Sequence, residues 1–132
     1  MFFSAPQNFG LLNPAELAYL GDAVFELLVR ERLIADGVRR GSVLHRRAAQ
    51  VCSSHGQARA ARVLMPMLTE TELSIFKKGR NAALSIAKKR SPTVHCTATG
   101  LEALFGDLYL RGEHSRLLEL FEICFSLQKD PE

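Results

Sequence analysis

Helix start and stop signals recur along almost the whole chain and leave little room for strands. Asn13 is a good N-cap, Pro14 suits the first helical position, and Glu16 completes a capping box. The pattern that follows predicts a helix running to about Asp36, where Gly37 ends it. This is the clearest helix signature in the sequence.

Further helices are predicted by the same criteria. Ser42 is expected to cap a second helix over about 42–52, and a third is expected over about 54–68. A capping box over residues 69–72 predicts a short helix that ends at Gly79. Residues 80–93 are less regular, with a break at Pro92; helices over about 97–111 and 113–128 then follow around Gly112. No stretch alternates as a strand would, so we expect an all-α, single-domain helical bundle over residues 1–132.

Composition supports one folded domain and limits its environment. The chain has 132 residues, 47% of them hydrophobic, which is enough to form one core. Its net charge of +3 is too small to identify a nucleic-acid partner without the distribution of charge. Three cysteines with no paired spacing indicate a reduced, cytosolic chain without a structural zinc site. No apolar run is long enough for a membrane span, and the first residues do not resemble a signal peptide.

Two predicted helices each combine a carboxylate with small residues. Gly21 precedes Asp22 in the first helix, and Glu102 lies four residues before Gly106 in a later one. Since small residues let helix axes approach closely, Gly21 and Gly106 are candidates for a close helix crossing. Such a crossing would bring Asp22 and Glu102 together, where they would repel unless a cation lies between them. Mg²⁺ uses one or two protein carboxylates in sites of this kind and can activate water at a phosphoryl group. Solvated surface charges and simple packing remain the alternative at this point.

A basic segment lies between the two acidic helices. No Asp or Glu occurs between Glu72 and Glu102, whereas Lys and Arg are frequent there. Local positive charge attracts polyanions, and side chains of this kind bind the phosphates of double-stranded RNA. The candidate RNA-binding residues are Lys77, Lys78, Arg80, Asn81, Lys88, Lys89 and Arg90. A solvated loop is the alternative interpretation.

Three ordered motifs resemble a known family. The segment NPAELAYLGDAVFELLVRERL (13–33) resembles the signature helix of the ribonuclease III catalytic domain. The segment TGLEALFGDLYL (99–110) resembles its second acidic motif, and KKGRNAA (77–83) is similar to its Gly-Arg-Asn-Ala segment. The resemblance covers nearly the whole chain and is strongest to the short branch, Mini-ribonuclease III, which has no double-stranded-RNA-binding domain.

The resemblance implies a specific function. It implies a cytoplasmic, metal-dependent endoribonuclease that cleaves double-stranded RNA to 5′-phosphomonoesters, with Asp22 and Glu102 as catalytic and Mg²⁺-binding residues and Mn²⁺ as a substitute ion. It also implies a homodimer that matures precursor ribosomal RNA, chiefly the large-subunit (23S) species, with a ribosomal protein as a helper. The dimer could use apolar residues of the first helix, although these could equally face their own core: Leu17, Leu20, Val24 and Phe25.

The sequence departs from the larger members of the family. They carry further acids where this chain has Ala15, Ala18 and Thr99, so only Asp22 and Glu102 remain. Glu26 could assist by hydrogen bonding or form a surface salt bridge. His45, in a short Leu-His-Arg motif, could be an acid-base group or a structural hydrogen bonder. A non-catalytic helical RNA-binding or ribosome-associated module, and a helical scaffold, are the rival functions.

Overall fold

The computed structural model describes residues 3, 12–86 and 92–127. They form six α-helices and one 3₁₀ turn, and no strand occurs among these residues. The elements are α1 (Pro14–Ala35), α2 (Gly41–Cys52), α3 (Ser54–Leu64), η2 (Met65–Met67), α4 (Glu70–Ile86), α5 (Pro92–Leu110) and α6 (His114–Ser126). The predicted all-α fold class is therefore confirmed. None of the described helices is both long enough and apolar enough to cross a membrane.

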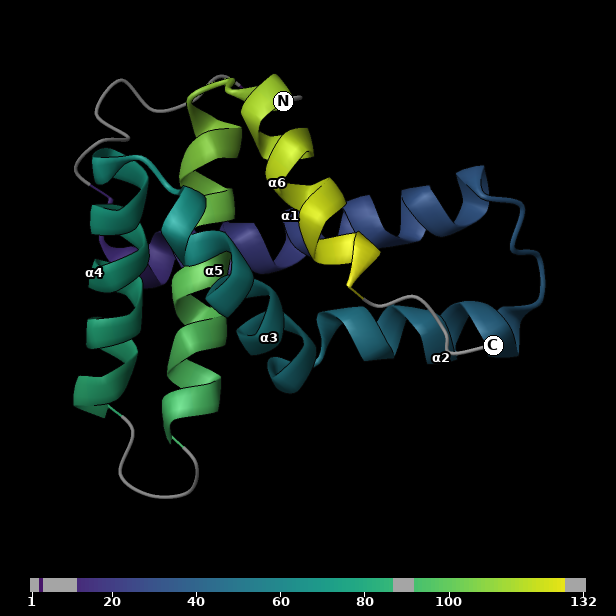
Figure 1. Cartoon of the computed structure of the whole chain (residues 1–132), viewed down its shortest axis with the longest axis horizontal. Coiled ribbons are helices and arrows are strands. Elements are labelled where there is room, and N and C mark those ends of the chain that lie inside the picture. The colour runs from purple at the N-terminus through teal and green to yellow at the C-terminus, as the bar shows by residue number, and fades with distance from the viewer. Residues whose placement is uncertain (1–2, 4–11, 87–91, 128–132) are drawn as a thin grey trace.

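Helix α5 lies at the centre of the bundle. Figure 1 shows α4 and α5 side by side and antiparallel, with α1 passing across α5 and continuing to a second, separate region beside α2. Helices α3 and α6 also pack against α5. Because α5 has neighbours on several sides, it is apolar nearly all round, with Leu101, Leu104 and Phe105 fully buried. The main core joins α1 to α5 and α6 through edge-to-face contacts of Phe25 with Phe105 and Phe121.

The predicted limits of α1 are confirmed. The Asn13 side chain accepts from the Glu16 backbone N–H at 2.8 Å, and the Glu16 carboxylate accepts from the Asn13 N–H at 3.0 Å. Asp36 forms the C-cap, and Gly37 follows with a φ of 90°. The left-handed conformation at Gly37 is one that other residues adopt only with strain, so it ends the helix as predicted.

Several other predicted boundaries were wrong. Helix α4 continues through Gly79 to Ile86, because Gly79 packs against α5 and a Cβ there would lie 2.7 Å from that of Ala103. Ser42 is not a cap, since α2 begins at Gly41 after an Arg40 N-cap with no side-chain hydrogen bond. The third helix ends at Leu64 and the 3₁₀ turn follows. The fifth helix begins earlier than expected, at Pro92.

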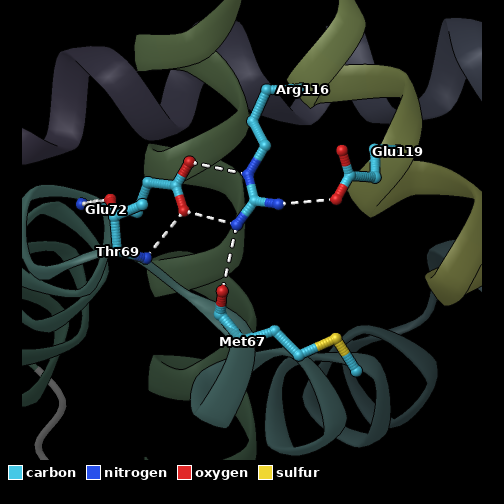
Figure 2. A network of polar contacts seen from close by, with 5 residues as sticks. All are labelled: Met67, Thr69, Glu72, Arg116 and Glu119. Atoms are coloured by element: carbon cyan, nitrogen blue, oxygen red, sulfur yellow. Dashed lines mark hydrogen bonds and ion pairs between the residues drawn. The ribbon is translucent and has the colours of Figure 1, made fainter.

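A buried ion pair ties α6 to the start of α4. Figure 2 shows the Arg116 guanidinium between the carboxylates of Glu72 and Glu119, with the Met67 carbonyl below it. Arg116 donates to both Glu72 oxygens, at 2.9 and 2.8 Å, while Glu72 also completes a capping box with Thr69. These hydrogen bonds hold the pKa of Glu72 below its ordinary value. The network fixes the turn between η2 and α4 against the last helix.

Helices α1 and α5 cross through two glycines. A Cβ at Gly21 would collide with the Glu102 carbonyl oxygen and lie 2.8 Å from the Gly106 nitrogen. A Cβ at Gly106 would collide in turn with the Leu17 carbonyl oxygen and lie 3.2 Å from the Gly21 nitrogen. Since the obstructing atoms are backbone, no side-chain rotation can make room. Gly21 and Gly106 are therefore the positions at which the backbones of α1 and α5 meet. They are the two glycines that the sequence suggested for a close helix crossing.

We expect Gly21→Ala to lower the free energy of unfolding by about 3 kcal/mol, the upper range for overpacking, and the melting temperature by roughly 10 °C. The added methyl group would force the α1 and α5 backbones apart. Thermal unfolding followed by circular dichroism measures the change. Gly41→Ala is the control, because a Cβ there meets nothing within 4 Å. Equal stability of Gly21→Ala and wild type would contradict the close crossing.

Candidate functional site

The crossing of α1 and α5 brings Asp22 and Glu102 together. Asp22 follows Gly21 directly, and Glu102 contributes the backbone carbonyl against which Gly21 packs. The two carboxyl groups lie within hydrogen-bonding reach of each other. Asp22 is exposed, whereas Glu102 is half-buried. Two acids 80 residues apart in the sequence therefore form one carboxylate pair at the protein surface.

The environment of Glu102 disfavours its charge. The pKa of Glu102 is raised from an ordinary value of 4.5 to about 8, mainly by burial and in addition by the neighbouring Asp22 carboxyl. One amide acts in the opposite direction, since a hydrogen bond from Gln57 lowers the pKa of Glu102. Two carboxylates that share a site in this way favour either a shared proton or a bound cation.

Two uncharged groups border the carboxylate pair, and neither was selected from the sequence as a site residue. Gln57, on α3, is 3% exposed and contacts Glu102. Cys52, at the end of α2, is half-buried; burial raises its pKa to about 12, with the charges of Glu26 and Asp22 adding to the effect. Both residues come from the segment between the acidic motifs, and only the packing of α2 on α1 and of α3 on α5 brings them to the site.

The donor set suits a hard cation with few protein ligands. Mg²⁺ commonly binds through one or two carboxylates and completes its shell with water and phosphate oxygens. Asp22 and Glu102 provide such a pair, and a cation would offset the repulsion that raises the pKa of Glu102. Among residues 12–86 and 92–127 no group of three or more His, Cys, Asp or Glu side chains is arranged to hold a metal ion. The pair therefore fits an ion that is bound largely through oxygens from outside the protein.

Glu26 is engaged elsewhere. It lies one turn beyond Asp22 on α1, and its carboxylate accepts a hydrogen bond from Arg30 at 2.7 Å. The Arg30 side chain is exposed and that of Glu26 is partly exposed. The structure thus places Glu26 in a surface ion pair beside the carboxylate pair, as one of the two sequence interpretations expected.

Two of the three positions that lack acids line an apolar pocket. Ala15 and Thr99 face the same cavity, together with Gly79 and His95 from α4 and α5. Thr99 donates its hydroxyl hydrogen bond to the His95 carbonyl at 3.0 Å, which leaves it little freedom to act as a ligand. Ala18 is buried against Ala103 in the second core cluster. None of the three residues replaces a missing carboxylate.

The basic segment is partly on α4. Lys77 and Lys78 are exposed, and Arg80 stacks over the Phe76 ring at 5.9 Å while contacting Asn81. The same helix packs through Gly79 against Gly100 and Ala103, less than one turn from Glu102. These cations therefore lie on a helix that packs against α5 beside the turn that carries Glu102. Lys88, Lys89 and Arg90 lie outside the described residues.

Other predicted residues lie away from the pair. His45 is exposed on α2 and lines a separate pocket with Arg30 and Ile34. The apolar residues that the sequence left between core and contact surface belong largely to the core: Leu17, Val24 and Phe25 are buried, and Leu20 packs against them. The large apolar side chains that α1 does expose are Tyr19, Leu27 and Ile34.

Comparisons with known proteins agree with this arrangement. A family model described as the ribonuclease III domain matches residues 15–113. Among curated proteins, the Mini-ribonuclease 3 of Symbiobacterium thermophilum is 44% identical over 84% of this chain and 86% of its own length. That of Brevibacillus brevis is 40% identical over 89% of this chain and 88% of its own. A crystal structure of a Fusobacterium nucleatum protein has the same fold, with a TM-score of 0.81, 21% identity and coverage of 94% of this chain and all of that one.

The raised pKa of Glu102 predicts how stability depends on pH when divalent ions are removed. Between pH 4.5 and about 8, Glu102 keeps its proton in the folded state, whereas in the unfolded chain it has lost it. The free energy of unfolding should therefore fall as the pH rises through this range. Glu102→Gln should weaken this dependence and be more stable than wild type near pH 8. Urea titrations in EDTA at several pH values measure the effect.

The control for this experiment has the opposite sign. Because the pKa of Glu72 is lowered, its contribution is present above pH 4.5 and is lost as the pH falls. Glu72→Gln should therefore be less stable than wild type at neutral pH, with the difference shrinking in acid. A Glu102→Gln variant with the pH dependence of wild type would show that the carboxylate pair is not strained.

Proposed function

The chain belongs to the ribonuclease III family and is an endoribonuclease for double-stranded RNA, and we propose that Asp22 and Glu102 form its active site. The observation that carries this proposal is the meeting of the two carboxylates at the crossing of α1 and α5. Both acids fall in the motifs by which the chain resembles the family.

We propose that the two carboxylates hold Mg²⁺, for which Mn²⁺ can substitute. The ion, when bound, activates a water molecule and stabilises negative charge on the phosphoryl oxygens. Asp22 approaches from the exposed side of α1, and Glu102 is held more rigidly in the bundle. Because both carboxylates stand on helices whose backbones touch, their separation is fixed before substrate arrives. The protein thus contributes position and charge, and hydrolysis yields 5′-phosphomonoesters.

The basic face of α4 is proposed to bind the RNA backbone. Lys77 and Lys78 are exposed, and Arg80 and Asn81 follow on the same helix. An arginine can bind a phosphate through two N–H groups, and an amide can donate to phosphate or ribose oxygens. Double-stranded RNA is recognised mainly through such contacts rather than through its bases. Lys88, Lys89 and Arg90, next along the chain, are proposed to bind RNA as well.

A homodimer is proposed because one site cleaves one strand. A two-fold pair of sites can address both strands of a duplex. Tyr19, Leu27 and Ile34 supply exposed apolar side chains on α1, and their spacing of eight and seven residues places them on one side of the helix. Burying this face against a second copy would remove it from water.

The cellular role follows from the branch that the chain resembles. We propose that it acts in the cytoplasm on precursor ribosomal RNA, chiefly the 23S species, as a single catalytic domain over residues 1–132 and with a ribosomal protein as a helper. The support is the similarity to several Mini-ribonuclease 3 proteins over most of the chain. The rival function is a non-catalytic RNA-binding or ribosome-associated module, which requires the basic face but no carboxylate pair.

Asp22→Asn should abolish cleavage while leaving folding and RNA binding nearly unchanged. Removing a residue that hydrogen-bonds to a metal ligand typically costs 10–100-fold in metal affinity or activity, so removing the ligand itself should cost at least about 100-fold in the rate of cleavage. Cleavage of a long RNA duplex is measured with Mg²⁺ or EDTA, alongside a gel-shift titration of RNA binding. Glu31→Gln, an exposed acid on the same helix, is the control. Wild-type rates in Asp22→Asn would leave the non-catalytic module as the better description.

Replacing Lys77 and Lys78 together by Gln should weaken RNA binding and reduce its salt dependence. Each lost phosphate contact lowers the slope of log affinity against log salt by about one. The duplex affinity is measured from low to moderate salt with divalent ions absent, so that cleavage does not interfere. Arg62→Gln removes an exposed cation from α3 instead and serves as the control. Equal salt slopes for the double variant and wild type would place the duplex on another surface.

A further inference from the structure

Gln57 is a buried polar side chain with a charged partner. It is 3% exposed on α3 and carries no charge, whereas the buried charged side chains of the described residues, Glu72 and Asp107, are each paired with an arginine. A buried amide without a partner costs about 1–3 kcal/mol. Gln57 meets this requirement by donating a hydrogen bond to the Glu102 carboxylate. Its polar group is therefore directed at one member of the carboxylate pair.

The local structure fixes where Gln57 lies. Ser53 caps α3, its hydroxyl oxygen accepting from the Gly56 N–H at 3.0 Å and its carbonyl accepting from the Gln57 N–H at 2.9 Å. Gly56 packs so tightly on the end of α2 that a Cβ would collide with the Gln50 carbonyl and lie 2.8 Å from that of Val51. The residue before Gln57 is thus held by backbone contacts. Helix α3 then packs along α5, which carries Glu102.

Glu102 is consequently held from two sides. Asp22 approaches it from α1, and Gln57 approaches it from α3. Charge repulsion from Asp22 would turn a free glutamate side chain away, whereas an amide donor attracts it. A glutamate has three rotatable side-chain bonds, so the Gln57 hydrogen bond removes freedom that Glu102 would otherwise lose on binding an ion.

We propose that Gln57 is a positioning residue that holds the Glu102 carboxylate ready to bind the divalent ion, an inference that rests on the proposed function. The hydrogen bond occupies part of the carboxylate and leaves its remaining acceptor capacity for the ion. Groups that hydrogen-bond to metal ligands in this way typically change metal affinity by 10–100-fold. A purely structural role for Gln57 would instead affect stability and leave the affinity for the ion unchanged.

The test is the affinity of the full chain for Mn²⁺, measured by electron paramagnetic resonance without RNA. Gln57→Met keeps the length of the side chain and removes the donor, and we expect it to weaken Mn²⁺ binding by about 10–100-fold. Gln50→Met, at an exposed position on α2, should bind Mn²⁺ as wild type does. In cleavage assays the Mn²⁺ concentration for half-maximal rate should rise for Gln57→Met, and the rate at saturating Mn²⁺ should largely recover.

The outcomes separate this inference from the function on which it rests. Gln57→Ala is a second variant should Gln57→Met not fold. A folded Gln57 variant that binds Mn²⁺ as tightly as wild type overturns the role of Gln57. If Asp22→Asn binds Mn²⁺ more weakly in the same experiment, the proposed function still stands. Loss of folding in both Gln57 variants also overturns the role of Gln57, because the amide would then be needed by the core. A wild-type chain that binds no Mn²⁺ and cleaves no duplex overturns the proposed function itself.

Discussion

The backbone contact between α1 and α5 at Gly21 and Gly106 is the constraint on which the site depends. Each glycine lies against backbone atoms of the opposite helix, so neither position can hold a side chain without separating the helices. Glycine weakens a helix interior by about 1 kcal/mol relative to alanine. The two longest helices nevertheless each contain such a glycine, because the crossing that the glycines allow brings Asp22 next to Glu102.

This crossing produces an electrostatic problem that other parts of the fold reduce. Burial and Asp22 both disfavour the charged form of Glu102, so the carboxylate pair destabilises the ion-free protein at neutral pH. The amide of Gln57 partly offsets the effect, and Arg30 balances the nearby charge of Glu26. By contrast, the Glu72–Arg116 pair is fully satisfied and contributes to stability. The unfavourable electrostatic interaction thus lies at the place where a cation would relieve it.

Local signals in the sequence predict some of these features well and others poorly. The capping box at Asn13 and the turn at Gly37 depend on neighbouring residues, so pattern alone places α1 correctly. Gly79 has the appearance of a helix end but lies inside α4, because its role is a contact with Ala103 on a distant helix. Gln57 carries no local mark at all, since its significance comes only from the packing of α3 on α5. Asp22 and Glu102 were selected from the sequence by their small-residue neighbours and by motifs, and their meeting was expected there only as the result of a close helix crossing.

The proposed metal site has only two carboxylates, and this determines where the other ligands of the ion come from. Ala15 and Thr99 line an apolar pocket, and Ala18 is buried against Ala103, so no third acid adjoins the pair from these positions. An ion held by two carboxylates takes most of its remaining oxygens from water and phosphate. Under the proposed function, RNA that reaches the basic face of α4 therefore supplies ligands as well as substrate. Binding of ion and binding of duplex then strengthen each other, because each brings charge that the other lacks.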